Sequence, residues 1–286
     1  MSTRITKRDV CLLEMLLANT VMSFEEVRVF GFSGRHKATV CNRLNRLEEL
    51  ALILRINVGN FIYKLNMKPI GVVVLITKEG IEVLKRCGRF DSRLRPEPIA
   101  LNIQSLIHDL ELNSVVRGLK RALPMALIFN GKHLQSDVSS LFKKVPDAVL
   151  ELPQANLEMA KALGVVASDA TIKGAGVLRV AVELELTAKS NPRYREIING
   201  YRLSREVDRV LYLTHDESIA QKIQSVLSGV PVKNNLRPHQ GMFSFLQVDK
   251  VALSVAQEIN VAQAKEACAT VESIGSQVKL AEVANG

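Results

Sequence analysis

The chain has 286 residues, of which 47% are hydrophobic and 23% are charged, as in globular proteins that bury a core. No apolar run approaches the ~18–20 residues that cross a bilayer, and no charged-then-apolar leader opens the sequence, so we expect neither membrane insertion nor secretion. The four cysteines form no C-x-x-C pair. Their scatter argues against a zinc knuckle or a disulfide framework and favours a reducing, cytoplasmic setting.

Positive charge is concentrated in the first third of the chain. The formal net charge is +9, and residues 1–100 hold 17 Lys and Arg against 10 Asp and Glu. The other residues hold 21 against 19 and are nearly neutral. A basic unit joined to a neutral one is typical of a nucleic-acid-binding module attached to a second domain. A solvated basic surface without a ligand is the alternative.

Three helices are predicted at the start of the chain. One begins after Thr6, and a second begins at Ser23, where a glutamate three residues later can complete a capping box. Glycines in residues 31–34 then break the pattern before a third helix over 35–52, which is apolar on one face and basic on the other. This order predicts a helix-turn-helix. We expect its third helix to contact DNA through Lys37, Thr39, Asn42, Arg43 and Arg46.

A wing follows the third helix. The predicted elements are a strand over 52–58, a turn at Gly59-Asn60, a partner strand over 61–65, a strand over 72–76 and a helix over 77–86. The order resembles winged helix-turn-helix domains, whose third helix enters the major groove of DNA. It predicts a DNA-binding domain over residues 1–88. Because many winged helices bind proteins instead, protein binding is the alternative.

Helices and strands alternate after a predicted linker at 89–100, which holds two prolines and three arginines. The expected elements are a helix over 103–123, strands over 126–130, 145–152 and 177–186, a helix over 193–207, a strand over 209–214, a helix over 216–227, a strand over 243–248 and an Ala-rich helix. Helix, three strands, helix and strand is the core order of restriction-endonuclease-like nucleases. We therefore expect a mixed α+β fold, with such a domain over 101–268 and a disordered tail over 269–286.

An acidic strand carries the candidate chemistry. Alternation places Glu183 and Glu185 on the same face of a mostly apolar strand, where unpaired carboxylates are costly. A divalent cation such as Mg²⁺ or Mn²⁺ would offset that cost, and Asp147 at the start of the neighbouring strand adds a third carboxylate. The nuclease motif is Pro-Asp, a gap, then Asp or Glu, any residue and Lys, so Glu185 occupies the position of the lysine. Lys189 is the nearest replacement in the sequence.

The residues around this strand leave two interpretations open. Glu111 or Asp109 on the first helix of the domain could supply a further metal ligand. The helix that follows the strand carries Arg193 and Tyr194, which we expect to face DNA. Its arginines could instead pair with Glu183 and Glu185 in a plain ion-pair network.

The winged helix, Pro146-Asp147-Ala-Val and the Glu-Leu-Glu strand followed by an Arg-Tyr helix resemble MobC-type plasmid mobilisation relaxases and related replication-relaxation proteins. The resemblance covers about residues 5–250. It implies a bacterial, cytoplasmic nickase that binds the double-stranded DNA of a plasmid transfer origin, with relaxosome proteins and a coupling protein as partners. It also implies that Asp147, Glu183 and Glu185 hold Mg²⁺ or Mn²⁺ during phosphodiester cleavage, with Lys189 beside them.

Two rival functions follow from the same residues. A catalytically inactive DNA-binding regulator of plasmid replication or transcription on the same fold is favoured by the missing motif lysine. A restriction or repair nuclease would share the core and cut without regard to a transfer origin.

Overall fold

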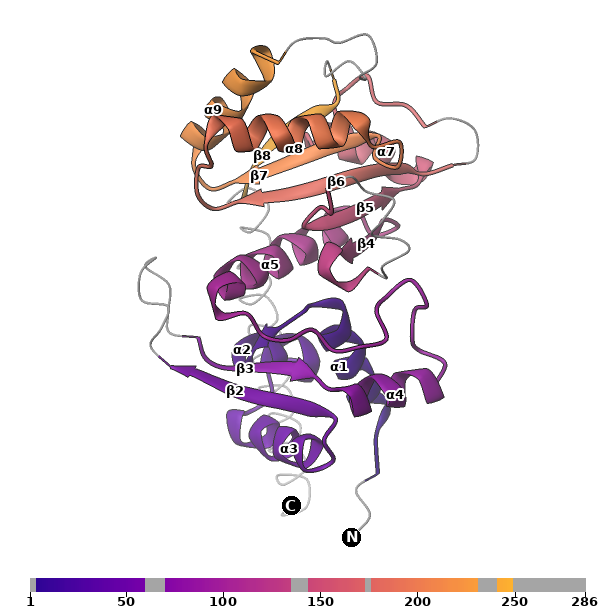
Figure 1. Ribbon diagram of the computed structural model, residues 1–286. Helices are drawn as coiled ribbons and strands as arrows, with labels where there is room; N and C mark the ends of the chain where they lie inside the picture. The colour runs from indigo at the N-terminus through magenta and orange to yellow at the C-terminus, as the bar shows by residue number, and fades with distance from the viewer. Residues whose placement is uncertain (1–3, 60–69, 135–143, 173–175, 231–240, 249–286) are drawn as a thin grey trace, which may run out of the picture.

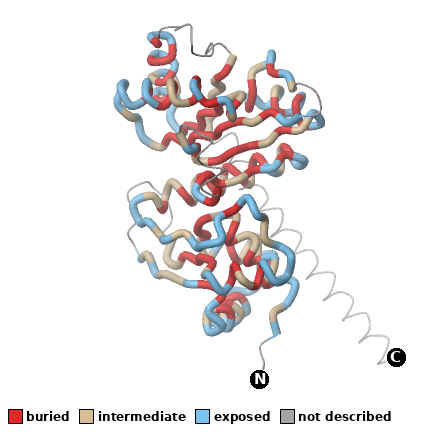
Figure 2. The backbone as a smooth tube through the Cα atoms, turned by 45° about the vertical axis from the view of Figure 1, so that its right-hand side comes forward, coloured by how far each residue is buried: buried red, intermediate tan, exposed pale blue. Residues whose placement is uncertain are grey.

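The computed structural model describes residues 4–59, 70–134, 144–172, 176–230 and 241–248. They form two units, one above the other in Figure 1, with helix α5 (Leu106–Ala122) between them. Each unit has its own sheet and its own group of buried aliphatic residues, and Figure 2 shows buried segments in both. Within the described ranges, no helix is long and apolar enough to cross a membrane.

The N-terminal unit packs helices against a three-stranded antiparallel sheet of order β1-β3-β2. Its elements are α1 (Lys7–Ala18), β1 (Met22–Ser23), α2 (Phe24–Glu26), η1 (Val27–Gly31), α3 (Lys37–Glu49), β2 (Ile53–Gly59), β3 (Gly71–Ile76) and α4 (Lys78–Arg86). This topology confirms the winged-helix architecture. The described partner of β2 is β3. The predicted strand over 61–65 lies outside the described ranges, so its pairing with 52–58 stays a prediction.

Local sequence signals explain where the first helices begin. The Thr6 hydroxyl accepts from the Asp9 backbone N–H, and the Asp9 carboxylate accepts from the Thr6 N–H at 2.6 Å. Ser23 and Glu26 form the second capping box, as predicted. Each box satisfies backbone donors that a helix N-terminus leaves without partners.

The C-terminal unit has a five-stranded sheet of order β4-β5-β6-β7-β8. Its elements besides α5 are η3 (Ile103–Ser105), β4 (Leu127–Asn130), η4 (Gly131–His133), β5 (Ala148–Leu152), α7 (Gln154–Ala162), β6 (Leu178–Glu185), α8 (Asn191–Leu203), β7 (Arg209–Thr214), α9 (Glu217–Ser228) and β8 (Phe243–Gln247). The first three strands are antiparallel, and β6, β7 and β8 are parallel. The mixed α+β fold class is confirmed. The predicted strands and flanking helices are present, but α7 lies between β5 and β6, so the prediction of three strands in direct succession is wrong. The predicted Ala-rich helix and the 269–286 tail lie outside the described residues.

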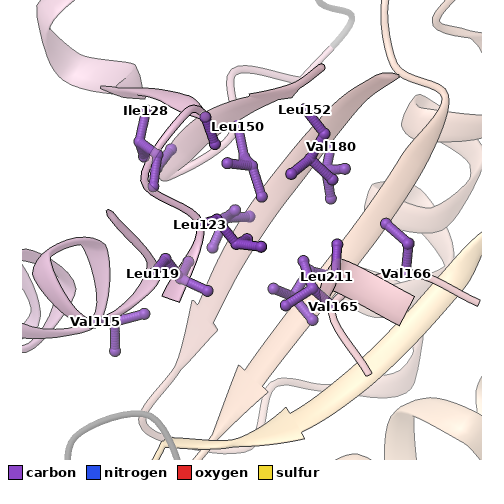
Figure 3. Packing of buried hydrophobic residues seen from close by; sticks show 14 of the residues in the cluster. Val115, Leu119, Leu123, Ile128, Leu150, Leu152, Val165, Val166, Val180 and Leu211 are labelled. Carbon is purple, nitrogen blue, oxygen red and sulfur yellow. The ribbon is translucent and has the colours of Figure 1, made fainter. Parts of the chain in front are cut away.

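Strand β6 separates two cores. Val180, Val182 and Leu184 pack with residues of α5, α7 and β5, in the cluster that Figure 3 shows in part. Ala181 belongs to the cluster on the other face, which contains residues of α8 and α9. The predicted alternation is therefore confirmed. It places Glu183 and Glu185 on the face of β6 that α8 covers.

Helix α5 also contacts the N-terminal unit. The Asn113 side-chain amide donates to the Val21 carbonyl at 2.6 Å, and Arg117 pairs with Glu26. The segment predicted as a linker, 89–100, touches both units, because Leu94 packs in the N-terminal core and forms a β-bridge with Leu134. Leu94 thus anchors a segment whose other residues are mostly exposed.

Candidate functional site

The exposed face of α3 is the first candidate site. Burial of Val40, Leu44 and Leu47 against the N-terminal core turns the opposite face of the helix to solvent. Four of the five α3 residues predicted to contact DNA are exposed on that face: Lys37, Thr39, Asn42 and Arg46. Neither Lys37 nor Arg46 has an ion-pair partner in the described part of the chain. Unpaired surface cations on one helix face suit contacts with phosphate.

Arg43 has a different place. Its guanidinium donates to the Asp9 carboxylate, with Nε 2.8 Å from Oδ1, and to the Arg4 carbonyl at 3.2 Å. Asp9 is 1% exposed. Burial raises the pKa of Asp9, but hydrogen bonds from Arg43 and Thr6 outweigh it and lower the pKa overall. Arg43 therefore fastens α3 to α1, and its predicted contact with DNA stays a prediction.

An acidic cavity of about 330 Å³ lies where the end of β6 meets the start of α5. It is lined by residues of η3, α5 and β6 and of the segments flanking β5 and β6: Gln104, Ile107, His108, Asp147, Glu183, Leu184, Glu185, Leu186, Thr187 and Lys189. Asp147, Glu183, Glu185 and Lys189, which the sequence analysis assigned to one catalytic site, thus border the same cavity.

Asp147 is held by its neighbours. Its Oδ2 accepts from the Leu184 backbone N–H at 2.8 Å and lies 3.3 Å from His108 Nε2. Burial alone would lower the pKa of His108, but its interactions with Asp109 and Asp147 raise that pKa to about 9. His108 is consequently an imidazolium at neutral pH and donates to Asp147. No sequence pattern indicated this contact between His108 and Asp147.

Gly131 fixes the backbone that carries Asp147. Its N–H donates to the Asp147 carbonyl at 2.8 Å. A Cβ at position 131 would lie 1.8 Å from the Pro146 carbonyl oxygen, a distance that real Cβ contacts do not reach. Only glycine therefore lets η4 approach the Pro146-Asp147 segment this closely.

Glu183 is the most enclosed carboxylate of the cavity. It is 2% exposed, and both Lys144 Nζ and the Tyr201 hydroxyl donate to its Oε1. Burial and the charge of Asp147 raise the pKa of Glu183 to about 7, although Lys144 and Tyr201 oppose the shift. Lys144 lies two positions before Pro146, and no sequence pattern singled it out.

Glu185 is also buried, with 1% of the residue exposed. Its Oε2 accepts from Lys189 Nζ, whereas its Oε1 has no hydrogen-bond partner in the described part of the chain. Burial raises the pKa of Glu185, and the Lys189 ammonium opposes that rise. Lys189 thus reaches the cavity, as predicted.

Three predicted residues do not line the cavity. The Glu111 carboxylate is 3.7 Å from His215 and does not line the cavity; His108, one turn earlier on α5, faces it instead. Tyr194 is fully buried, and its hydroxyl accepts from the Lys189 N–H at 3.0 Å, which corrects its predicted contact with DNA. Arg193 is exposed and pairs with Glu196 at 2.6 Å rather than with the acidic strand.

The carboxylates do not form a ready-made metal site. In the ranges that the structure describes, no group of three or more His, Cys, Asp or Glu side chains is arranged as metal ligands. Each carboxylate meets a cationic side chain instead: His108 for Asp147, Lys144 for Glu183 and Lys189 for Glu185. The chemistry of the donors nevertheless fits a hard divalent cation, because oxygen ligands border one cavity and Glu185 Oε1 lacks a partner.

Comparisons with known proteins give no family. No family model matches the chain, and no curated protein matches it. One solved structure, a protein with a GntR superfamily winged-helix-turn-helix domain from Halomicrobium mukohataei, aligns with 20% identity and a TM-score of 0.26. The alignment covers 30% of this chain and 59% of that one, less than two thirds of its length. At that TM-score the likeness carries no weight, so the winged-helix assignment rests on the strand order and the helices themselves.

Proposed function

We propose that this protein binds double-stranded DNA through α3 and cleaves a phosphodiester bond at the acidic cavity with Mg²⁺ or Mn²⁺. The observation that carries the proposal is the placement of Asp147, Glu183 and Glu185 around one cavity on the expected strand order. The resemblance to mobilisation relaxases adds the DNA target and the type of cleavage, which is a nick at a plasmid transfer origin. Relaxosome proteins and a coupling protein are the partners that the resemblance adds.

The three carboxylates would hold the cation. A bound Mg²⁺ or Mn²⁺ supplies Lewis-acid polarisation of the phosphate and lowers the pKa of a bound water. His108 keeps Asp147 ionised and oriented by donating to it, and the Leu184 N–H fixes the same carboxylate oxygen. Glu183 and Glu185 are held by side chains that can withdraw, because the lysines are partly exposed.

The motif lysine has two replacements near the site. Lys189 follows the acidic strand and contacts Glu185, and Lys144 contacts Glu183 from the segment before Pro146. Either ammonium can neutralise charge that develops on a phosphate oxygen once the carboxylates face a metal ion. The missing lysine at position 185 is therefore no obstacle to the chemistry.

An inactive DNA-binding regulator is the second candidate. The pairing of every cavity carboxylate with a cationic side chain favours it, because such a cluster is balanced without a metal ion. A restriction or repair nuclease would use the same cavity and differ in the DNA that it cuts.

A supercoiled-plasmid assay separates these functions. Wild type and Glu183→Gln are incubated with Mg²⁺ or Mn²⁺ and with plasmids that carry or lack the cognate transfer origin. We expect wild type to relax only the origin plasmid and Glu183→Gln to bind DNA without relaxing it. Glu158→Gln on the exposed face of α7 is the matched control and should behave as wild type.

Each other outcome points to a rival. Relaxation of both plasmids would favour the general nuclease. Intact origin plasmid under every metal tried, with DNA binding retained, would favour the inactive regulator and remove the enzymatic proposal.

A further inference from the structure

A second cavity, of about 210 Å³, lies at the junction of the two units and apart from the acidic site. Its lining comes from the end of α1, the 89–100 segment, α5, β4 and η4: Ala18, Asp91, Arg93, Leu94, Lys120, Ala126, Leu127, Ile128, Phe129, Asn130 and His133. Most of these side chains are apolar. A cavity of this size suits a small molecule with an apolar body.

Two buried side chains that line this junction cavity have nitrogens without partners. Asn130 is 5% exposed; its Oδ1 accepts from the Lys132 N–H at 3.0 Å, whereas its Nδ2 has no partner in the described part of the chain. His133 is 2% exposed; its Nε2 lies 3.1 Å from the Thr20 hydroxyl, and its Nδ1 is likewise unpartnered within the described ranges. Buried polar atoms are rarely left unsatisfied, and such exceptions call for an explanation.

The neutral ring of His133 can supply a second donor beside the Asn130 amide. Burial lowers the pKa of His133 to about 4, so the ring is neutral at pH 7. When the Thr20 hydroxyl donates to Nε2, the ring hydrogen lies on Nδ1. Asn130 Nδ2 and His133 Nδ1 then offer hydrogen bonds to an acceptor in the cavity.

The charges around the cavity favour an anionic acceptor. Arg93 is already paired with Asp91 at 2.8 Å and lies over the Phe129 ring at 4.2 Å. Lys120, in contrast, has an exposed side chain and no ion-pair partner among the described residues. One unpaired cation and two unpaired donors match the two oxygens of a carboxylate.

We propose that the junction cavity binds a small monocarboxylate with an apolar body. Its carboxylate accepts from Asn130 Nδ2, His133 Nδ1 and Lys120 Nζ, and its body packs on Leu94, Ile128 and Phe129. Because both units contribute to the lining, the bound molecule links them and stabilises the whole chain.

The test compares a carboxylate with its neutral counterpart. The unfolding midpoint of the full chain is measured with about 10 mM sodium benzoate, benzamide or sodium chloride, since ligands of this size bind weakly. We expect benzoate to raise the midpoint by about 2–4 °C and benzamide and chloride to leave it unchanged. Phenylacetate repeats the test with a longer body.

Two variants locate the effect. Lys120→Met removes the unpaired cation, and Asn130→Asp keeps the acceptor for the Lys132 N–H while replacing the Nδ2 donor with a charged oxygen. Both should abolish the benzoate shift, and Lys78→Met on the exposed side of α4 should retain it. The proposal is overturned if neither carboxylate shifts the wild-type midpoint, if benzamide shifts it equally, or if Lys120→Met responds as wild type does. Should Asn130→Asp unfold, Lys120→Met alone decides.

Discussion

Helix α3 and the acidic cavity carry charge in opposite ways. Lys37 and Arg46 project from α3 into solvent, whereas Glu183 and Glu185 are buried and each contacts a lysine. An exposed cation costs little in water, but a buried carboxylate must be compensated. Helix α3 thus exposes cations that a polyanion could contact. Under the proposed function, a divalent cation would take the place of the lysines beside the cavity carboxylates.

Gly131→Ala should have the largest effect on the acidic cavity and on the free energy of unfolding, and it should leave α3 unchanged. The added Cβ would clash with the Pro146 carbonyl and move Asp147, at a cost of about 3 kcal/mol in the free energy of unfolding. Urea denaturation measures this cost. Gly200→Ala is the control, because its Cβ would make ordinary contact and a helical alanine is favoured by about 1 kcal/mol. Equal stability of the two variants would contradict the proposed constraint.

Glu183→Gln should change how the free energy of unfolding depends on pH. The pKa of Glu183 is about 7 in the folded protein and 4.5 ordinarily, so the folded state binds more protons between these values. Wild type therefore loses up to about 3 kcal/mol as pH rises from 4.5 to 7, and the loss persists above pH 7. Glu183→Gln lacks that loss and should exceed wild type in stability at pH 8, with little difference at pH 4. If urea denaturation gave the same pH dependence of unfolding free energy for wild type and Glu183→Gln, the raised pKa of Glu183 would be contradicted.

Arg43→Met tests whether this arginine belongs to the fold or to the DNA-binding face. Asp9 would stay buried without its main partner, so we expect a loss of about 2 kcal/mol in unfolding free energy. Per folded molecule, DNA affinity should change little. Unchanged stability together with a sharp fall in DNA affinity would instead show that Arg43 contacts DNA.

Arg46→Ala should show the reverse behaviour, with the smallest effect on stability. Its side chain is exposed and has no ion-pair partner in the described ranges, so stability should stay within about 0.5 kcal/mol of wild type. DNA affinity should fall, and its salt dependence should decrease by a slope of about one if a phosphate contact is lost. Fluorescence titration at several salt concentrations measures both. Unchanged DNA affinity would make the winged helix a protein-binding module.

The sequence predicts this architecture well where periodicity is local. The face of β6 that carries Glu183 follows from strand alternation, and the capping box at Ser23 follows from residue spacing. Helix α7 was not predicted from the sequence. It begins at Gln154, soon after β5 ends, and its N-cap residue Pro153 makes no side-chain hydrogen bond.

Contacts between distant residues explain what else the sequence did not predict. Arg43 reaches Asp9 across 34 positions, and Lys144 reaches Glu183 across 39, so no local pattern signals either pair. Tyr194 sits beside exposed arginines in the sequence, but α8 turns it into the core. Charge and periodicity can predict which residues lie in a charged cluster. Only the packed structure shows which of them pair with one another.

We propose that the acidic cavity accepts a divalent cation in exchange for its lysine contacts. Titration calorimetry with Mn²⁺ at pH 8 tests it on wild type, Glu185→Gln and the surface control Glu158→Gln. We expect wild type and Glu158→Gln to bind Mn²⁺ alike and Glu185→Gln to bind it at least tenfold more weakly, because the unpartnered Oε1 is lost as an anionic ligand. Absence of binding to wild type, or equal binding by Glu185→Gln, would contradict the claim and leave the cavity a closed network of ion pairs.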